Sequence, residues 1–148
     1  MPPTLIRTNS IIPRHSVRNY VEAWSNADVD SCIAPFGTDG TYCDPAVPKP
    51  TLARELKERW AGFFSGFPDL RFETVGLNSI SENIWVWRWI GRGTNTGSFA
   101  GAPPTGRQME LPGCEFIEVR GGRIHGVVGY YDRLTMLSQL GLSSAAQA

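Results

Sequence analysis

The sequence predicts a single α+β domain in which helices come first and a mostly antiparallel sheet follows. Up to residue 69 the apolar residues repeat with the period of helices, and after it they repeat with the period of strands. Helices followed by a run of strands are typical of α+β domains. We expect one domain over residues 1–148, with its core between about residues 10 and 142, because no repeat, linker or low-complexity block interrupts the chain.

Three helices are expected before residue 69. The first covers Arg14–Asn26, and its buried face carries Val17, Tyr20, Val21 and Trp24. The second is short and follows an N-cap at Asp28, after which the GTDG turn leads into a brief extended segment, Thr41–Asp44. The third begins at Thr51, behind three prolines, and turns inward Leu52, Leu56, Trp60, Phe63 and Phe64.

Four strands are expected after residue 69, near residues 70–77, 82–97, 107–120 and 123–132. Tight turns join them at Asn78–Ser81 and at Gly121-Gly122. A closing helix, Arg133–Leu140, would bury Leu134, Leu137 and Leu140. Helices lying on one face of a curved sheet would enclose a cone with a pocket at its open end.

Composition excludes several classes of protein. The 148 residues include 14 Lys+Arg and 14 Asp+Glu, and 41% are hydrophobic, so the chain resembles neither a dedicated nucleic-acid binder nor a disordered protein. No apolar run approaches the roughly 20 residues that span a bilayer, and prolines interrupt the first residues. Three cysteines without CxxC spacing indicate neither a disulfide framework nor a thiolate zinc site. We therefore expect a cytoplasmic protein with no membrane and no nucleic-acid partner.

Five stretches of the sequence resemble the SnoaL-like polyketide cyclase family, a branch of the nuclear transport factor 2-like superfamily of cone-shaped α+β domains. They are YCDP (42–45), FPDLRFE (67–73), GTNTGSFAGAPPTGR (93–107), EVRGGRI (118–124) and YYDRLTMLSQLGL (130–142). The resemblance spans almost the whole chain and implies the cone fold. The same cone hosts cyclases, ketosteroid isomerase, limonene epoxide hydrolase, dehydratases and non-catalytic binding proteins, so the site residues have to decide the function.

Two aspartates are the candidate acid/base groups. Asp44 lies in YCDP, where the extended segment would enter the pocket, and it resembles the catalytic base of ketosteroid isomerases. The alternative for Asp44 is a turn-forming residue before Pro45. Asp132 ends the last expected strand and matches the aspartate that is assigned as general acid/base in SnoaL-like cyclases. The alternative for Asp132 is the N-cap of the helix that begins at Arg133.

Three further residues are candidates for donating or transferring a proton. Glu115 is the only carboxyl group on an apolar strand face, so we expect a neutral acid with a pKa above the ordinary value of about 4.3. An ion pair of Glu115 with Arg88 or Arg92 is the alternative. Tyr20 resembles the oxyanion-hole tyrosine of ketosteroid isomerases, and is otherwise a core residue. His125 follows the Gly-Gly turn, and an imidazole suits acid/base chemistry.

Aromatic residues are expected to shape the pocket. Trp85, Trp87 and Trp89 share one strand face and would form an apolar wall for a flat ligand, although core packing explains at least one of them equally well. The other expected substrate-binding residues are Tyr42, Trp60, Phe63, Phe99 and Tyr131. The two histidines have no metal-ligand spacing, so we expect neither a metal nor another cofactor.

These residues together predict a cofactor-independent cyclase or isomerase that moves protons on a hydrophobic, carbonyl-containing metabolite of polyketide or terpenoid type. Two alternatives stay open. Water addition of the epoxide hydrolase type would need an Asp-Arg-Asp arrangement with Arg88 turned inward, and a non-catalytic binding module would leave the carboxyl groups paired or exposed. Apolar residues on both faces of the expected sheet also predict a homodimer.

Overall fold

The computed structural model describes residues 15–142 and contains one six-stranded sheet with helices against it. The helices are α1 (His15–Ser25), α2 (Val29–Ile33), α3 (Lys57–Gly66) and α4 (Arg133–Gln139), with a 3-10 turn, η1 (Ala53–Leu56), before α3. The strands are β1 (Phe36–Asp44), β2 (Val47–Leu52), β3 (Arg71–Ser79), β4 (Ile84–Thr94), β5 (Gln108–Arg120) and β6 (Arg123–Tyr131). None of these helices is long and apolar enough to cross a membrane.

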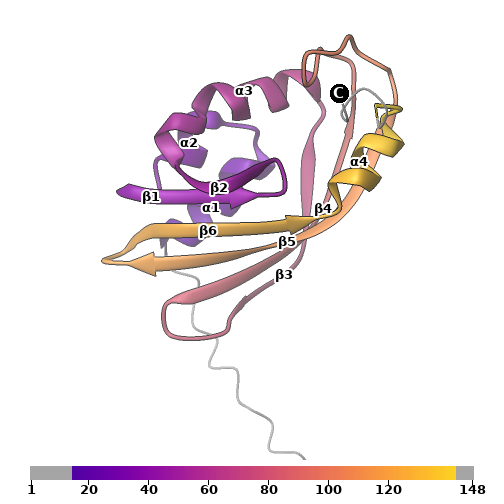
Figure 1. The fold of residues 1–148 in the computed structure, drawn as a ribbon. Coiled ribbons are helices and arrows are strands. Elements are labelled where there is room, and N and C mark those ends of the chain that lie inside the picture. Colours follow the sequence, from indigo (N-terminus) through magenta and orange to yellow (C-terminus); the bar gives the residue numbers. More distant parts are fainter. Residues whose placement is uncertain (1–14, 143–148) are drawn as a thin grey trace, which may run out of the picture.

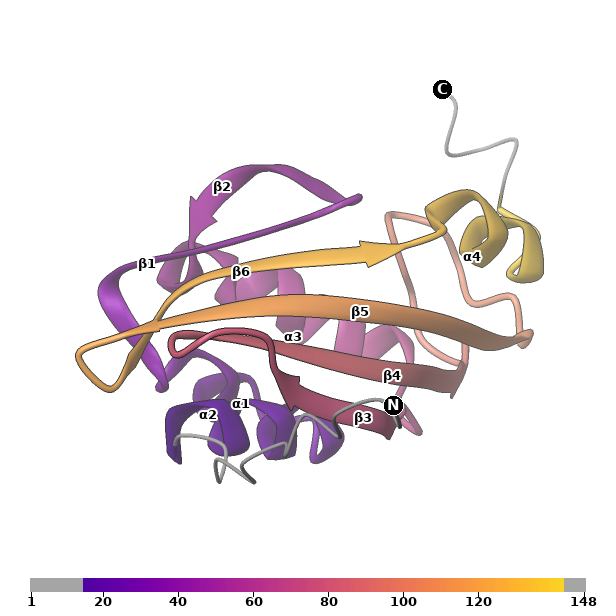
Figure 2. The same cartoon turned by 90° about the horizontal axis from the view of Figure 1, so that it is seen from below.

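The sheet is curved and mostly antiparallel. Its strands follow the order β2-β1-β6-β5-β4-β3, and β1 with β6 is the one parallel pair of neighbours among the described strands. In Figure 1 the helices α2 and α3 lie above the sheet and α4 lies beyond the end of β6. Seen from below, β4, β5 and β6 lie in front of α3 (Figure 2). The expected α+β class is confirmed.

The first two helices follow the prediction. α1 buries Val17, Tyr20 and Trp24 on one face, because these positions recur at helical spacing. Asp28 caps α2, and its side chain accepts a hydrogen bond from the Ser31 backbone N–H at 3.2 Å. Residues 10–14, which the expected core and first helix include, lie outside the described residues.

The GTDG turn before β1 is a correction to the sequence prediction. These residues belong to β1, which begins at Phe36 and pairs in parallel with β6 through an irregular register between Phe36 and Thr41. A Cβ at Gly40 would come within 2.7 Å of the Ile124 carbonyl oxygen. Gly40 therefore lets the backbones of β1 and β6 approach closely. A glycine needed for such a contact cannot be distinguished in the sequence from a glycine that forms a turn.

The expected start of the third helix at Thr51 is also wrong. Residues 47–52 form β2, an edge strand, and the α-helix begins at Lys57 after η1. Pro48 and Pro50 are exposed on this edge, where the missing backbone N–H needs no strand partner. Leu56 and Trp60 are buried as expected. The apolar spacing therefore predicted which residues are buried, although residues 51–56 are not α-helical.

The second half of the chain agrees with the prediction to within a few residues at each strand end. Gly121 and Gly122 have φ values of 57° and 76°, as the tight hairpin between β5 and β6 requires. The expected burial of Leu134 is wrong, because it is 62% exposed, while Leu137 is buried. α4 packs on β5, and Met136 occupies the buried side instead.

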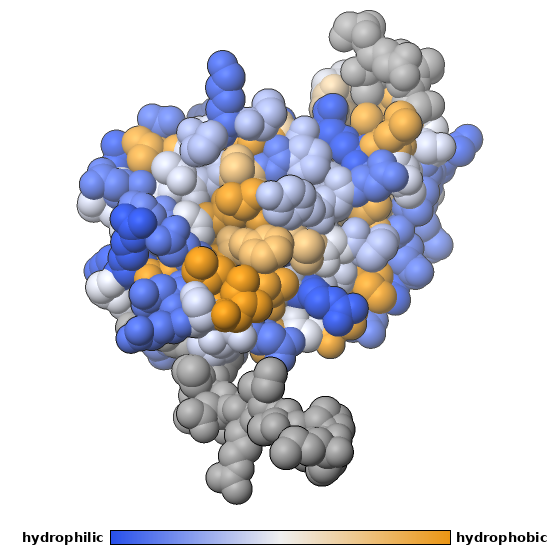
Figure 3. Space-filling model, turned by 60° about the horizontal axis from the view of Figure 1, so that its bottom comes forward, coloured by the Kyte–Doolittle hydropathy of each residue, from blue (hydrophilic) through white to orange (hydrophobic). Residues whose placement is uncertain are grey.

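The outer face of the sheet carries exposed apolar residues. Phe116, Val128 and Tyr130 are 38%, 36% and 56% exposed. Val86, Phe116 and Val128 lie in one row across β4, β5 and β6, and Tyr130 packs edge-on against Phe116. Figure 3 shows apolar side chains gathered on this underside of the molecule. The expected homodimer remains a prediction, and this apolar patch is its basis.

Candidate active site

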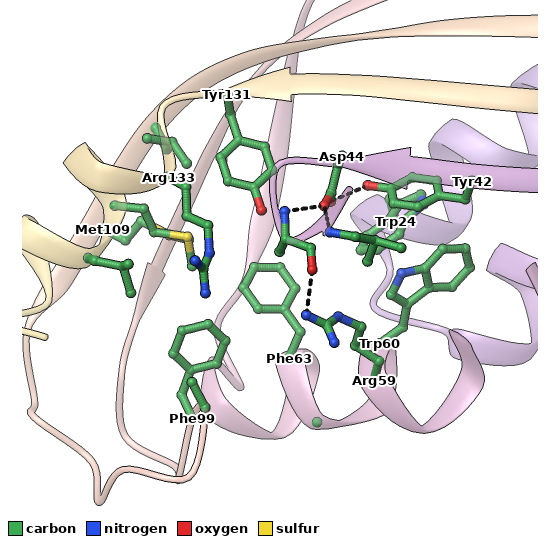
Figure 4. A pocket seen from close by; sticks show the side chains of 18 of the residues that line it. Trp24, Tyr42, Asp44, Arg59, Trp60, Phe63, Phe99, Met109, Tyr131 and Arg133 are labelled. Carbon is green, nitrogen blue, oxygen red and sulfur yellow. Dashed lines mark hydrogen bonds between the residues drawn. The ribbon is translucent and has the colours of Figure 1, made fainter. Parts of the chain in front are cut away.

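A cavity of about 450 Å³ opens between α3, the start of α4 and the β4–β5 loop (Figure 4). Its walls are mostly aromatic and aliphatic, and they include six of the eight expected substrate-binding residues. These are Tyr42, Trp60, Phe63, Phe99, Tyr131 and Trp89. Acidic groups from β1 and β5, Asp44 and Glu115, interrupt the apolar lining. An apolar cavity with few convergent polar groups is the usual form of a small-molecule site.

Glu115 is buried in the cavity wall, with only 5% of its surface exposed. Its Oε1 accepts a hydrogen bond from the Tyr20 hydroxyl at 2.5 Å, and its Oε2 accepts one from Trp89 Nε1–H at 2.9 Å. Burial is the main influence on the pKa of Glu115 and raises it to about 7. The two hydrogen bonds favour the charged form and lower the pKa, whereas the negative charge of Asp44 raises it. Burial therefore favours the neutral form of this carboxyl group.

No arginine of the described residues pairs with Glu115. Arg88 is exposed on the opposite face of β4, and Arg92 forms ion pairs with Glu73 at 2.6 Å and Glu110 at 2.9 Å. The ion-pair alternative for Glu115 is therefore not realised. Burial without a cation leaves desolvation as the dominant influence on this acid.

Asp44 ends β1 and is fixed by three hydrogen bonds. Its Oδ1 accepts from the backbone N–H groups of Ala46 at 2.7 Å and Val47 at 2.8 Å, and its Oδ2 accepts from the Tyr42 hydroxyl at 2.8 Å (Figure 4). The two interpretations of Asp44 are thus compatible, because one oxygen closes the β1–β2 turn and the residue still lines the cavity.

Gly129 of β6 leaves the space in which the acidic groups meet. It pairs with Glu115 in the sheet, and a Cβ at this position would lie 3.3 Å from Asp44 Cβ, 3.4 Å from Glu115 Cγ and 3.6 Å from the Tyr42 hydroxyl oxygen. Side chains from β1 and β5 therefore converge over a bare backbone position between them. Three ionisable groups share one wall of an apolar cavity as a result.

The β4–β5 loop forms one side of the cavity, with residues 98–101 in its lining. Asn95 is fully buried, donates a hydrogen bond to the Gly66 carbonyl at 3.2 Å and accepts one from the Thr105 N–H at 2.9 Å. Phe99 extends from this loop and packs against Phe63 of α3, with ring centroids 5.8 Å apart. The anchored loop holds an aromatic side chain over the opening.

Asp132 and His125 do not line the cavity. Asp132 is exposed and caps α4, accepting from the Thr135 backbone N–H at 3.0 Å and hydroxyl at 2.8 Å. His125 has no opposite partner on β5, because Ile124 and Gly126 pair with the consecutive residues Val119 and Glu118. His125 is the extra residue of a β-bulge that interrupts the side-chain alternation of β6, so it does not join the other candidate acid/base groups at the cavity.

Tyr20, Trp85 and Trp87 lie beneath the cavity and do not line it. Tyr20 is fully buried and reaches the site only through its hydrogen bond to Glu115. Trp85 and Trp87 are 2% and 0% exposed, and Trp87 packs edge-on against Tyr20 with ring centroids 6.1 Å apart. α1 covers this end of the sheet, so of the three tryptophans in a row only Trp89 contacts the cavity.

The sequence prediction missed two basic residues of the cavity. Arg59 and Arg133 both contribute to its lining, from α3 and from the first residue of α4. Arg59 precedes Trp60 and Arg133 follows Asp132 in the sequence. However, nothing in the sequence indicates that the two arginines line the same cavity. No cluster of three or more His, Cys, Asp or Glu residues that could hold a metal ion occurs within residues 15–142.

The profile of SnoaL-like polyketide cyclases matches residues 14–140. The chain belongs to the SnoaL-like polyketide cyclase family. The resemblance inferred from the five sequence stretches is therefore confirmed, and it extends over both the cavity and the sheet.

Solved structures place this SnoaL-like chain among cone-shaped relatives. IdmH, a candidate polyketide cyclase from Streptomyces antibioticus, is 26% identical, with a TM-score of 0.71 over 85% of this chain and 96% of that chain. AclR, a candidate hydroxylase from Streptomyces galilaeus, is 21% identical, with a TM-score of 0.74 over 85% and 92%. A protein from Catenulispora acidiphila with a ketosteroid isomerase-like fold, bound to trimethylamine, is 19% identical, with a TM-score of 0.70 over 86% and 93%. A search of curated proteins finds no match.

Proposed function

We propose that this protein is a cofactor-independent cyclase or isomerase that transfers a proton on a hydrophobic carbonyl compound. The observation that carries the proposal is the convergence of Asp44, Glu115 and Tyr42 over Gly129 in the wall of an apolar cavity. Family membership supports a cyclase or isomerase activity. An apolar cavity favours such chemistry because it excludes water from the carbanion or enolate that forms.

Asp44 is the proposed general base. Its Oδ1 is occupied by two backbone N–H groups, whereas Oδ2 accepts only the Tyr42 hydroxyl and retains a free lone pair. That oxygen takes a proton from the carbon next to the substrate carbonyl and returns it at another position or after ring closure. The three hydrogen bonds fix the carboxylate in one orientation toward the cavity.

Glu115 is the proposed donor to the carbonyl oxygen. In its neutral form it donates a hydrogen bond that strengthens as negative charge develops on that oxygen. Tyr20 and Trp89 hold both of its oxygens in place, so Tyr20 is a positioning residue. Because the neutral form is required and the pKa is about 7, we expect the reaction to slow as the pH rises through 7.

Water addition of the epoxide hydrolase type is the less favourable proposal. It would need Arg88 between two aspartates, but Arg88 lies on the outer face of β4, opposite Cys114 of β5. Asp132 does not reach the cavity either. The described residues therefore offer no Asp-Arg-Asp arrangement within the cavity.

The test uses proton abstraction itself, so it needs no knowledge of the substrate. Exchange of the protons next to the ketone of 2-tetralone in D₂O is followed by NMR. We expect wild type to accelerate the exchange and Asp44→Asn to lose about 100-fold of that acceleration. Asp39→Asn, an exposed aspartate on the same strand, is the matched control and is expected to keep it. Equal exchange by Asp44→Asn and wild type, or none by wild type, contradicts the proposal.

A further inference from the structure

Two arginines stand at the mouth of the cavity without a carboxylate partner among the described residues. Arg59 comes from α3 and Arg133 from α4, and Figure 4 shows both side chains pointing into the open space beside Phe63 and Phe99. The ion pairs within residues 15–142 are Lys57–Asp30, Arg92–Glu73, Arg92–Glu110 and Arg120–Glu118. Neither arginine of the cavity takes part in any of them.

Arg59 is fixed in position by the turn that holds Asp44. Its guanidinium donates a hydrogen bond to the Ala46 carbonyl oxygen at 2.7 Å, while the Ala46 N–H donates to Asp44 at 2.7 Å. A cation that is already held in one place loses less side-chain entropy when a ligand binds. Arg59 is therefore prepared to receive an anion beside the proposed base.

Tyr131 experiences the charges of both arginines. Burial in the cavity wall raises the pKa of its hydroxyl, the negative charge of Asp44 raises it further, and the positive charges of Arg133 and Arg59 lower it. The two guanidiniums thus act on one hydroxyl group from different elements. Two guanidiniums and a phenol hydroxyl are donors that suit a carboxylate.

The acidic residues of the cavity do not neutralise this pair. Glu58 lies at the same mouth, but it is exposed and forms no ion pair with either arginine. Asp44 is bound to Tyr42 and to the β1–β2 turn, and Glu115 is buried against Tyr20 and Trp89. The positive charge at the mouth remains available to a ligand.

We infer that the cavity takes a ligand with an apolar body and a carboxylate, and that Arg59 and Arg133 hold the carboxylate at the mouth beside Tyr131. That this ligand is a substrate rests on the proposed function. Arg59 and Asp44 are hydrogen-bonded to the same residue, Ala46, and both line the cavity, so the carbons near a carboxylate held by Arg59 lie near the base. The substrate class is then a keto acid whose ketone lies a few bonds from its carboxylate.

The test compares two probes with the same ring system, 2-naphthoate and its uncharged ester methyl 2-naphthoate, by isothermal titration calorimetry. We expect wild type to bind the carboxylate about 10-fold more tightly than the ester at low salt, and expect 0.5 M NaCl to reduce that ratio. Arg59→Met and Arg133→Met are each expected to lower the ratio to about 3 or less, and Arg133→Lys to restore part of it. Arg88→Met, on the outer face of the sheet, is the matched control and is expected to keep the full ratio.

The inference is overturned by a ratio near 1 in wild type, or by an unchanged ratio in both methionine variants. If a methionine variant fails to fold, the wild-type ratio, its salt dependence and Arg133→Lys still decide. Binding is measured separately from proton exchange, so the two proposals can fail separately. A ratio near 1 with exchange that depends on Asp44 contradicts only the arginine site. A high ratio without such exchange contradicts only the proposed reaction.

Discussion

Replacing Glu115 with glutamine tests whether a buried neutral acid occupies the cavity wall. Burial raises its pKa from an ordinary 4.5 to about 7, so the folded protein keeps a proton that the unfolded chain releases in this interval. The contribution of Glu115 to the free energy of unfolding therefore falls as the pH rises from about 4.5 to 7. At 1.36 kcal/mol for each pKa unit, the stability lost through this group is roughly 3 kcal/mol by pH 8.

The side chain of glutamine does not ionise, so the Glu115→Gln variant does not lose stability through this position as the pH rises. We expect the difference in unfolding free energy between Glu115→Gln and wild type to move in favour of the variant by roughly 3 kcal/mol from pH 4.5 to pH 8. Urea unfolding followed by tryptophan fluorescence at both pH values gives this difference. All other titrating groups are present in both proteins and cancel. The altered hydrogen bonds of the amide to Tyr20 and Trp89 add an offset that does not depend on pH.

Glu118→Gln is the matched control on the same strand. Glu118 pairs with Arg120 at 2.9 Å, and its side chain is 37% exposed. Removing its charge is expected to change the stability by less than about 1 kcal/mol at either pH. A stability difference for Glu115→Gln that is equally independent of pH would refute a neutral Glu115. A variant that becomes relatively less stable as the pH rises would show that the carboxylate is ionised and stabilised in the fold.

Four further predictions follow from the same structure. Asp132→Asn is expected to leave 2-tetralone exchange unchanged, and Asp132→Ala is expected to lower the unfolding free energy by about 1 kcal/mol. Slower exchange by the asparagine variant would show that Asp132 takes part in the reaction. Gly113→Ala is expected to displace the Trp89 ring, which a Cβ there would overlap, and to destabilise the protein by about 1–3 kcal/mol; unchanged stability and exchange would contradict this packing. Light scattering is expected to give twice 16.3 kDa for wild type and 16.3 kDa for Val128→Glu; a wild-type mass of 16.3 kDa at micromolar concentration would contradict the dimer. Treatment with EDTA is expected to leave exchange unchanged, and a loss that zinc or magnesium restores would contradict metal independence.

Alternation along a strand was sufficient to predict the environment of Glu115. Its neighbours on one face of β5, Met109, Leu111, Ile117 and Val119, are all buried, and the carboxyl group among them is buried too. A regular strand repeats its side-chain direction every two residues, so this inference needs no tertiary information. Alternation does not extend through His125 in the same way, because a β-bulge there adds one residue to β6 and shifts the side-chain directions, and no residue type in the sequence indicates where that shift occurs.

The sequence by itself determined the α+β class, the family, the helix cap at Asp28 and the inward face of β5, because each depends on neighbours within a few positions or on motifs that span the chain. Only the tertiary structure decided which carboxylates share the cavity. β1 pairs with β6, which brings Asp44 beside Glu115 across Gly129, whereas Asp132 remains outside at the cap of α4. Strand pairing between distant segments sets these distances, and local periodicity contains no information about which strands become neighbours.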